Sequence, residues 1–250
     1  MNIARAGALL LLGCMPCAAG AQVIFSDDFA DGDDADWLRA DFIGSTTYSV
    51  TGGRYQMATP PLPPLDTFAF AGSAVIASAF DPSFANGVFR ASVRMDNEQT
   101  NAAMVARANL MGTAGYGFLL NNANPAQSFI GIGALDNLIA VETFAMPLVA
   151  GVEYIMEGTL FGTALSLKVW EAGSAEPAEP QVRWNDSAYS MGLIGVAVLN
   201  QPVQAGGSGG VLSASFDDVS FTIPAPIVTP LLLVMGPVAC RGMRRRYVGG

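Results

Sequence analysis

Short runs of alternating apolar and polar residues fill the chain between residues 22 and 222, and turn residues such as Gly52-Gly53 and Asn86-Gly87 separate them. In Val88–Met95, one residue parity is apolar and the other carries Arg90, Ser92 and Arg94. Period-two alternation is typical of strands with one buried face, and no long 3.6-residue helical period competes with it. The sequence therefore predicts an all-β fold of two antiparallel sheets packed as a sandwich. The expected strands are 25–29, 46–50, 54–57, 68–78, 88–95, 103–110, 116–120, 129–135, 138–144, 152–160, 164–171, 192–199 and 211–222.

Composition excludes several classes of protein. The chain is 51% hydrophobic and 13% charged, which excludes a disordered polymer. It contains no histidine, which excludes Ser-His and Cys-His nucleophile systems and most zinc sites. All 21 acidic residues lie between Asp27 and Asp218, together with seven of the 12 cations, so the body is strongly acidic. An acidic body repels phosphate backbones, and we therefore expect no nucleic-acid partner.

The first 21 residues have the pattern of a secretory signal peptide. Arg5 gives a positive start, residues 6–13 are apolar, and Ala19 and Ala21 form a small-x-small cleavage site. The sequence therefore predicts a mature chain that begins at Gln22. Two alternatives stay open at this point. Residues 11–14 (Leu-Leu-Gly-Cys) resemble a lipobox, and an apolar stretch of this length also fits a core helix.

The last 28 residues, 223–250, combine three features in a fixed order. Pro224-Ala225-Pro226 is followed by an apolar stretch that ends at Cys240, and then by arginines at 241, 244, 245 and 246. As a helix, the 18 residues from 223 to 240 would reach about 27 Å, which just spans the hydrocarbon layer. The arginines would remain on the cytoplasmic side. This pattern predicts an exported body with a hydrophobic C-terminal helix.

The same tripartite tail resembles the PEP-CTERM sorting signal of bacteria that carry exosortases. The sorting residues would be Pro224, Ala225 and Pro226 with Arg244, Arg245 and Arg246. Ala225 stands in place of the usual glutamate, prolines interrupt the apolar segment, and residues 247–250 extend past the basic tip. The resemblance implies an exosortase-type protease as partner, transient insertion into the inner membrane, and a final location in the cell envelope or outside the cell. The alternative is a plain C-terminal membrane anchor.

Five strings in the body resemble parts of secreted concanavalin A-like (laminin G-like) domains. They are the opening 26–33 with Trp37 and 48–54, the central 154–177, and the closing strings 192–196 and 215–221. The resemblance covers nearly all of residues 22–222. It implies a jelly-roll sandwich in which the first and last strands are neighbours. It implies fold more than function, because such domains bind sugars, proteins or no known ligand.

Two acidic pairs are candidate ligands for a structural calcium ion. In the last strand, Phe216 and Phe221 have opposite parity, so the alternation of apolar and polar residues shifts by one position at Asp217-Asp218. This shift predicts a β-bulge there. If the first and last strands pair, Asp27 or Asp28 could approach Asp217 or Asp218, and residues 31–36 add further oxygens. Residues 31–42 do not form an EF-hand loop, because position 42 is phenylalanine instead of glutamate. The alternative is that these aspartates form turns exposed to water.

Two tryptophans are candidates for stacking on a sugar ring. Trp170 has the parity opposite to its apolar neighbours, so it is expected to point outward. Trp184 precedes Asn185 and Asp186, a polar setting that suits a saccharide site. The alternatives are that Trp170 lies on the other face of its sheet and that Trp184 packs at the edge of the sandwich over a loop.

A catalytic site is not expected. Glu153 and Glu157 have the outer spacing of the Glu-x-Asp-x-Glu strand found in glucanases of this fold, but Ile155 replaces the central aspartate. On a flat strand the two carboxylates would lie about 13 Å apart, whereas a retaining mechanism needs about 5.5 Å. The sequence thus favours a non-catalytic exported module that binds polysaccharide or a matrix component. The alternatives are a carbohydrate-active hydrolase and a structural surface protein without a ligand.

Overall fold

The structure, a computed structural model, describes residues 20–41, 46–60, 69–75, 82–109, 112–136, 139–200 and 210–225. Gly20–Pro224 forms one compact unit. The predicted signal peptide up to Ala19, the lipobox-like string, Pro226, the C-terminal apolar segment and Arg244–Arg246 lie outside the described residues. None of the helices in the described ranges has the length and apolarity needed to span a bilayer.

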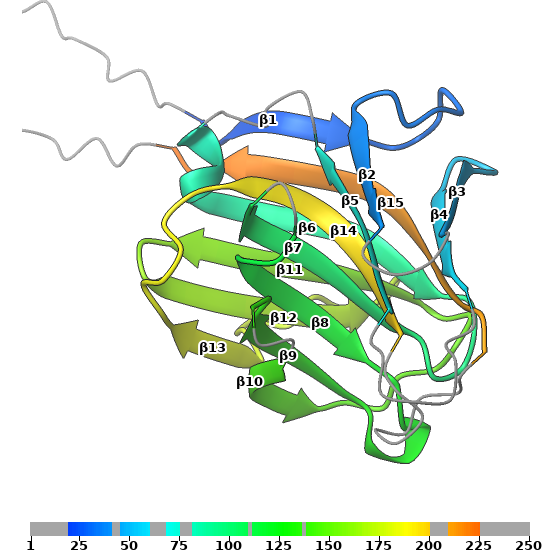
Figure 1. Ribbon diagram of the computed structural model, residues 1–250. Helices are drawn as coiled ribbons and strands as arrows, with labels where there is room; N and C mark the ends of the chain where they lie inside the picture. Colours follow the sequence, from blue (N-terminus) through cyan, green and yellow to red (C-terminus); the bar gives the residue numbers. More distant parts are fainter. Residues whose placement is uncertain are drawn as a thin grey trace, which may run out of the picture. The chain divides into compact units, whose positions relative to one another are not determined.

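Two antiparallel sheets pack as a sandwich, which confirms the predicted jelly-roll class (Figure 1). The strand order is β13-β12-β11-β6-β15-β4-β3 in the eight-stranded sheet, where β1 also pairs with β15, and β10-β9-β8-β7-β14-β5-β2 in the seven-stranded sheet. The elements are β1 (Gln22–Asp27), β2 (Trp37–Asp41), β3 (Thr47–Val50), β4 (Tyr55–Thr59), β5 (Ala69–Val75), η1 (Pro82–Ala85), β6 (Gly87–Met95), β7 (Asn101–Ala108), β8 (Tyr116–Asn121), η2 (Pro125–Gln127), β9 (Phe129–Ala134), β10 (Ile139–Ala145), β11 (Glu153–Phe161), β12 (Ala164–Glu171), β13 (Val182–Asn185), β14 (Leu193–Asn200) and β15 (Leu212–Ile223).

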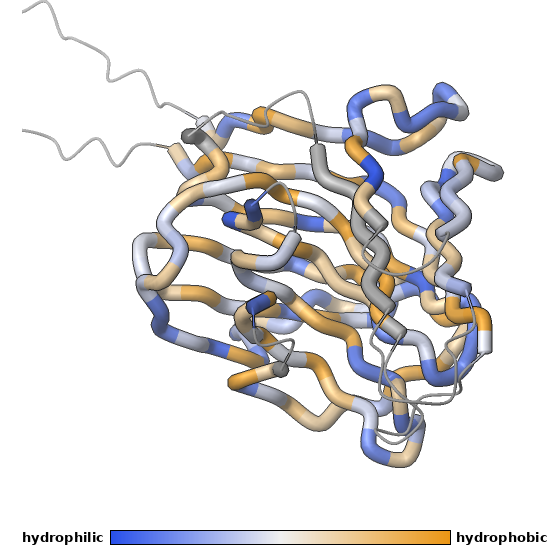
Figure 2. Tube along the Cα trace, viewed as in Figure 1, coloured by the Kyte–Doolittle hydropathy of each residue, from blue (hydrophilic) through white to orange (hydrophobic). Residues whose placement is uncertain are grey.

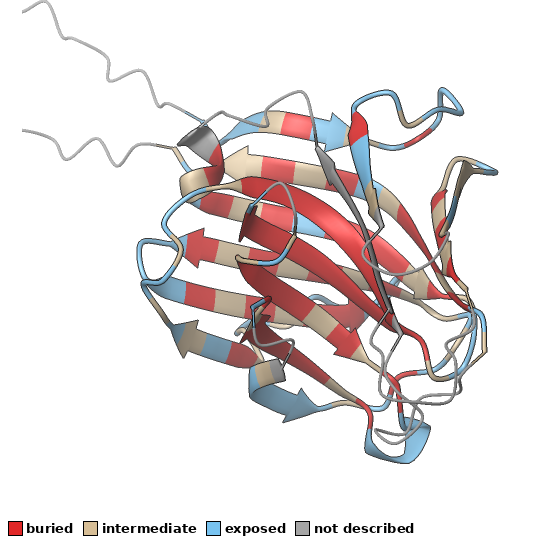
Figure 3. Cartoon of the chain, in the orientation of Figure 1, coloured by how far each residue is buried: buried red, intermediate tan, exposed pale blue. Residues whose placement is uncertain are grey.

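The core lies between the sheets, and the alternation of the sequence explains it. In β6, the side chains of Phe89, Ala91, Val93 and Met95 are fully buried, as their shared parity predicts. Figure 3 shows the same buried bands in the neighbouring strands. Burial of this apolar surface must stabilise the body, because all three cysteines lie outside it.

Charge is distributed unequally between the two sheets. In the strands of the seven-stranded sheet, the only charged residues are Arg39 and Asp41 of β2, Arg107 of β7 and Glu142 of β10. Most other charged side chains belong to the strands and loops of the eight-stranded sheet, and the hydrophilic β1–β2 turn stands out in Figure 2. The outer face of the eight-stranded sheet is therefore the polar face of the molecule.

The first and last strands are neighbours, as the family resemblance implied. β1 pairs with β15 from Gln22 opposite Ile223 to Asp27 opposite Val219. The other half of β15 pairs with β4. Between these two pairings the register of β15 against β6 shifts, and Asp218 has a φ of 47°. The predicted bulge at Asp217-Asp218 is therefore confirmed.

Two strands were not predicted from the sequence. β2 contains Trp-Leu-Arg-Ala-Asp, and β13 contains Val-Arg-Trp-Asn. Neither sequence alternates cleanly between apolar and polar residues. Both are short edge strands, and their pairing with β5 and β12 depends on contacts outside their own sequence.

Candidate ligand-binding face

The outer face of the eight-stranded sheet brings together charged side chains that are far apart in the sequence. Register places Glu157 opposite both Arg90 of β6 and Lys168 of β12. It also places Arg94 opposite Glu153. Residues directly opposite on one sheet face lie close enough to interact. Two clusters of ion pairs result, one around Arg54 and one around Glu157.

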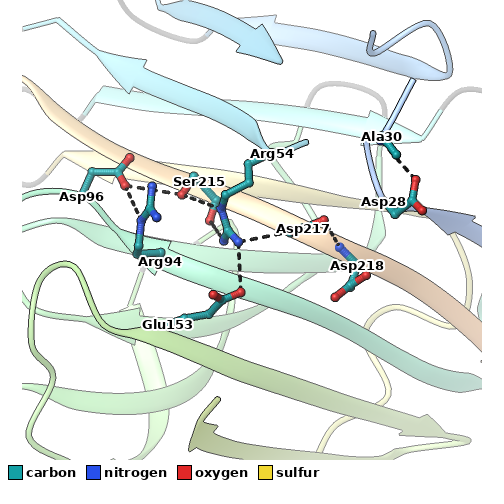
Figure 4. Close-up of polar contacts among 9 residues, drawn as sticks. All are labelled: Asp28, Ala30, Arg54, Arg94, Asp96, Glu153, Ser215, Asp217 and Asp218. Carbon is teal, nitrogen blue, oxygen red and sulfur yellow. Dashed lines mark hydrogen bonds and ion pairs between the residues drawn. The ribbon is translucent and has the colours of Figure 1, made fainter. Parts of the chain in front are cut away.

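The Arg54 cluster is built by a tight hairpin turn. Gly52 and Gly53 both have positive φ values, 62° and 72°, as expected for the central residues of a two-residue turn. The turn ends at Arg54, whose side chain extends across the outer face of the sheet (Figure 4). Its Nη1 atom lies 3.0 Å from Glu153 Oε1 and 3.4 Å from Asp217 Oδ2. The Arg54 side chain is 13% exposed, whereas Asp217 is 24% and Glu153 37% exposed, so water reaches the Glu153 end of the cluster and screens that pair.

Ser215 joins the Arg54 cluster to a second arginine. Arg54 Nε donates to Ser215 Oγ over 3.2 Å, and Ser215 Oγ donates to Asp96 Oδ1 over 3.4 Å. Asp96 in turn accepts from Arg94 Nε at 3.0 Å. Burial raises the pKa of Asp217, and the neighbouring Asp218 charge adds to the shift. The carboxylates of this cluster are occupied by guanidinium groups of the protein itself.

The Glu157 cluster joins side chains of three strands, β6, β11 and β12, and of the β12–β13 loop. Lys168 Nζ lies 3.6 Å from Glu157 Oε1 and 2.5 Å from Glu176 Oε1, a residue of the β12–β13 loop. Arg90 Nη1 lies 3.8 Å from Glu157 and 4.0 Å from Glu176, so it is held more loosely. The Glu176 hydrogen bond raises the pKa of Lys168, and Lys168 lowers the pKa of Glu176. Arg90 keeps 45% of its side chain exposed and can still contact a ligand.

Trp170 lies on this outer face, as its parity predicted. It pairs with Ile155, whereas its neighbour Val169 belongs to the core. The ring is nevertheless only 7% exposed, and the Arg90 guanidinium lies 5.0 Å from the ring centroid. The cation covers the ring that a sugar would stack on. Sugar stacking on Trp170 therefore stays a prediction that requires Arg90 to move.

A hollow of about 670 Å³ opens beside the Glu157 cluster. One side is the β1–β2 turn and the other is the bulge of β15, and Arg90 completes the lining. This volume is in the range of small-molecule sites. The lining residues are Ser26, Asp27, Asp28, Asp31, Asp33, Ala35, Asp36, Arg90, Asp218, Val219 and Ser220.

Three of the four predicted metal ligands meet at this hollow. Asp27, Asp28 and Asp218 line it, whereas Asp217 points to Arg54 because the bulge sends the two consecutive aspartates to different partners. Within the part of the chain that the structure describes, no three acidic or cysteine residues are grouped closely enough to hold a metal ion. The calcium site therefore stays a prediction.

The acidic turn is shaped by its own side chains. Asp28, Asp31 and Asp33 each accept a hydrogen bond from the backbone N–H two residues ahead. Such bonds fix the turn. Within the described part of the chain, the second carboxylate oxygen of each of these three aspartates has no hydrogen-bond partner. Asp27 is more committed, because its Oδ1 accepts from Phe29 N at 2.8 Å and its Oδ2 from Trp37 Nε1 at 2.6 Å.

Trp184, Asn185 and Asp186 lie elsewhere, on and just after β13. Trp184 pairs with Leu165, faces the core side and meets the Tyr116 ring edge to face at 5.6 Å. The Asp186 carboxylate accepts from the Tyr116 hydroxyl at 2.6 Å, and burial raises the pKa of that tyrosine to about 12. Asn185 is exposed. The structure does not bring this group together with Trp170, which lies at the other end of β12.

Arg54 is the residue of this face that sequence reasoning missed. Its partners Glu153 and Asp217 are 99 and 163 residues away in the chain. Only the strand order β11-β6-β15-β4 brings them close together. The Gly-Gly pair before Arg54 predicted a turn, but nothing local indicated where the guanidinium would point.

Comparison with known proteins supports the fold. No family model matches the chain, and none of the curated proteins matches it in sequence. An endo-β-1,3(4)-glucanase of family GH16, SCLam, superposes with a TM-score of 0.56 at 9% identity, covering 82% of this chain and 92% of the glucanase. A Bacillus subtilis protein of unknown function with a galectin-like fold gives 0.54 at 11% identity, covering 81% and 97%. The carbohydrate-binding module CBM66 from Bacillus subtilis gives 0.50 at 14% identity, covering 74% and 93%. The chain thus has a galectin-like or concanavalin A-like β-sandwich fold.

Proposed function

We propose that this chain is an exported, non-catalytic β-sandwich that binds a polysaccharide on the outer face of its eight-stranded sheet. The observation that carries the proposal is the hollow, in which free carboxylate oxygens, two serine hydroxyls and the loosely held Arg90 converge. Carboxylates accept short hydrogen bonds from hydroxyl groups, and a guanidinium donates several in one plane. Such a lining suits a polyhydroxylated ligand. The fold is also that of a solved carbohydrate-binding module.

The charge of the hollow restricts the polysaccharide. Six aspartates line it against one arginine. Uronic or sulfated polymers would be repelled. We therefore propose a ligand without negative charge.

A hydrolase is the weaker alternative. Glu153 and Asp217 both lie within 3.4 Å of one nitrogen of Arg54, so their separation alone would suit a retaining pair. The guanidinium, however, stands between them and holds both as ion pairs. Glu157 is likewise engaged by Lys168 and Arg90. A carboxylate whose oxygens are engaged by a cation in this way is a poor nucleophile.

Binding to a panel of neutral polysaccharides tests the function. The triple variant Asp28→Asn, Asp31→Asn and Asp33→Asn keeps the side-chain oxygens that form the turn but removes their charge. We expect its affinity to fall at least about tenfold, because hydrogen bonds to charged groups contribute roughly 1.5–3 kcal/mol each. Glu142→Gln, exposed on the other sheet, is the matched control and is expected to bind normally.

Three outcomes of this assay count against the proposal. Absence of binding by every polysaccharide favours a structural surface protein, and release of shortened sugars favours the hydrolase. If Glu142→Gln loses as much affinity as the triple variant, the hollow is not the binding site. The same binding assay with a calcium chelator tests the proposed calcium ion. If calcium bridges the polysaccharide to the protein, the chelator should abolish binding, whereas a polysaccharide that contacts the protein directly should stay bound.

Export and sorting are proposed from the sequence of the two ends. The first strand begins at Gln22, the predicted mature N-terminus, and β15 ends at Ile223, directly before Pro224-Ala225-Pro226. The mass of the chain isolated from its native cells measures both ends. We expect residues 1–21 to be absent and the chain to end near Pro226. A full-length chain would contradict export, and a chain that lacks only residues 1–21 would indicate a plain anchor.

A further inference from the structure

We propose that the end of the sandwich from which the C-terminal segment leaves rests on the surface of a lipid bilayer. This inference rests on the proposed C-terminal membrane segment, and it adds which part of the folded body touches the lipid. Figure 1 shows the arrowheads of β15 and β11 and the short helix η1 at this one end of the body, which we call the tail end.

Strand register fixes which residues share the tail end. Leu160 of β11 lies opposite Gly87 of β6, and β15 continues this row with Ile223. Phe161 and Pro224 each follow the row by one residue. Two strand spacings of about 4.8 Å separate them, so Phe161 lies about 10 Å to the side of the point where the chain leaves the body.

The linker after this row is too short to hold the body away from a membrane. Only Pro224, Ala225 and Pro226 separate β15 from the apolar stretch that begins at Ile227. Fully extended, three residues span at most about 10–11 Å. If the apolar stretch lies in the bilayer, the tail end must lie within that distance of the bilayer surface.

Three exposed apolar side chains belong to the tail end. Phe161 is 64% exposed at the β11–β12 hairpin, and Met191 is 57% exposed in the β13–β14 loop. Val23, which pairs with Thr222, is also 57% exposed. Water solvates apolar surface unfavourably, so the transfer of these side chains into lipid favours contact with the bilayer.

Buried Arg107 holds two of these side chains on neighbouring loops. Its Nη1 donates to Gly162 O and to Tyr189 O, each over 2.9 Å. One nitrogen thus ties together the hairpin residue next to Phe161 and the loop residue two positions before Met191. The body therefore presents both apolar side chains from loops that are fixed to each other.

Charge distinguishes the tail end from the opposite end of the same sheet. At the opposite end, the strands and their loops carry Asp96, Glu153 and Glu171. Charged groups are costly to move from water toward lipid, so that end is unsuited to a bilayer. The segments at the tail end that contain no charged residue are 82–89, 158–167, 187–193 and 219–224.

Fluorescence quenching by brominated lipid tests this proposal on the full chain in vesicles of zwitterionic phosphatidylcholine. Phe161→Trp places a fluorophore at the tail end. Val149→Trp is the matched control, because Val149 is 55% exposed in the loop before β11, at the opposite end. The original chain supplies the background of its three tryptophans. Brominated acyl chains should lower the added fluorescence of Phe161→Trp by about half or more, because a side chain at the boundary of headgroups and acyl chains meets the bromine.

A second substitution measures the contribution of the β13–β14 loop. When Met191→Asp is combined with Phe161→Trp, we expect the ratio of docked to undocked tail ends to fall about tenfold, because a buried apolar side chain of this size is lost. Val211→Asp, at a position that is 52% exposed just before β15, is the control and should leave the quenching unchanged. Far-UV circular dichroism shows whether each variant keeps its strands.

Flotation of the same vesicles separates failure of the membrane segment from failure of the docked tail end. A chain that floats with the vesicles but shows no quenching at position 161, or equal quenching at position 149, overturns the docked tail end and leaves the membrane segment standing. A chain that does not float overturns both. The assay contains no sugar, so its outcome is independent of the proposed binding of polysaccharide.

Discussion

Arg107→Lys is expected to lower the free energy of unfolding by roughly 3 kcal/mol or more, although it keeps the charge. Arg107 is 2% exposed, and burial lowers the pKa of its guanidinium. Its Nε donates to Ala85 O over 2.8 Å, and its Nη1 donates to Gly162 O and to Tyr189 O, each over 2.9 Å. Lysine has a single nitrogen and cannot reach all three carbonyls. Two of these part-buried carbonyl oxygens would lose a hydrogen bond to a charged group, at about 1.5–3 kcal/mol each.

Urea unfolding of Arg107→Lys beside Arg183→Lys measures this effect. Arg183 has 59% of its side chain exposed and pairs with Glu179 at the surface, so its replacement should change stability by less than about 0.5 kcal/mol. Equal stability of the two variants would show that the three loops around Arg107 do not depend on it. Arg107 also has a φ of 49°. Arginine and lysine at position 107 carry the same backbone strain at this φ, so the strain does not contribute to the difference in stability between the variant and the original chain.

Trp37→Ala should destabilise the chain by about 3–5 kcal/mol and weaken sugar binding at the same time. Trp37 is 4% exposed, and its ring lies 5.6 Å from that of Phe29 and 5.7 Å from that of Tyr55. Its indole N–H also bonds Asp27, the residue at which the acidic turn begins. Loss of the ring leaves a cavity and frees the turn that lines the hollow.

Trp37→Phe separates these two contributions. It keeps an aromatic ring in the cluster but loses the donor to Asp27, so we expect a smaller loss of about 2 kcal/mol. Unfolding in urea, read by far-UV circular dichroism, compares the two variants. A loss for Trp37→Phe as large as for Trp37→Ala would mean that the hydrogen bond, and not the packed ring, holds the turn.

Local sequence pattern was sufficient for most of the fold. The parity of Val88–Met95 predicted which of its side chains are buried, and the slip at Asp217-Asp218 predicted the bulge. Both follow from the two-residue repeat of a strand, which is a property of the chain itself. β2 was missed because its residues do not alternate cleanly and its pairing with β5 depends on the rest of the sheet.

The candidate site was only partly predictable, because it depends on contacts across the sheet. The proximity of Asp27 and Asp28 to Asp218 followed from the expected pairing of the first and last strands. The Arg90 guanidinium of β6 lies over the Trp170 ring of β12, although β11 separates the two strands in the sheet. Parity predicted that Trp170 points outward, but a sequence does not reveal which side chain lies above a ring.

The side-chain N–H signals of the three tryptophans test the central claim most directly. Trp37 bonds Asp27 at the hollow, Trp170 lies beneath Arg90 at its rim, and Trp184 packs on Tyr116 away from it. On titration with a bound polysaccharide, followed by nuclear magnetic resonance, the signals of Trp37 and Trp170 should shift and that of Trp184 should stay unchanged. A saturating ligand that shifts Trp184 alone, or none of the three, would contradict the assignment of the outer face of the eight-stranded sheet as the binding site.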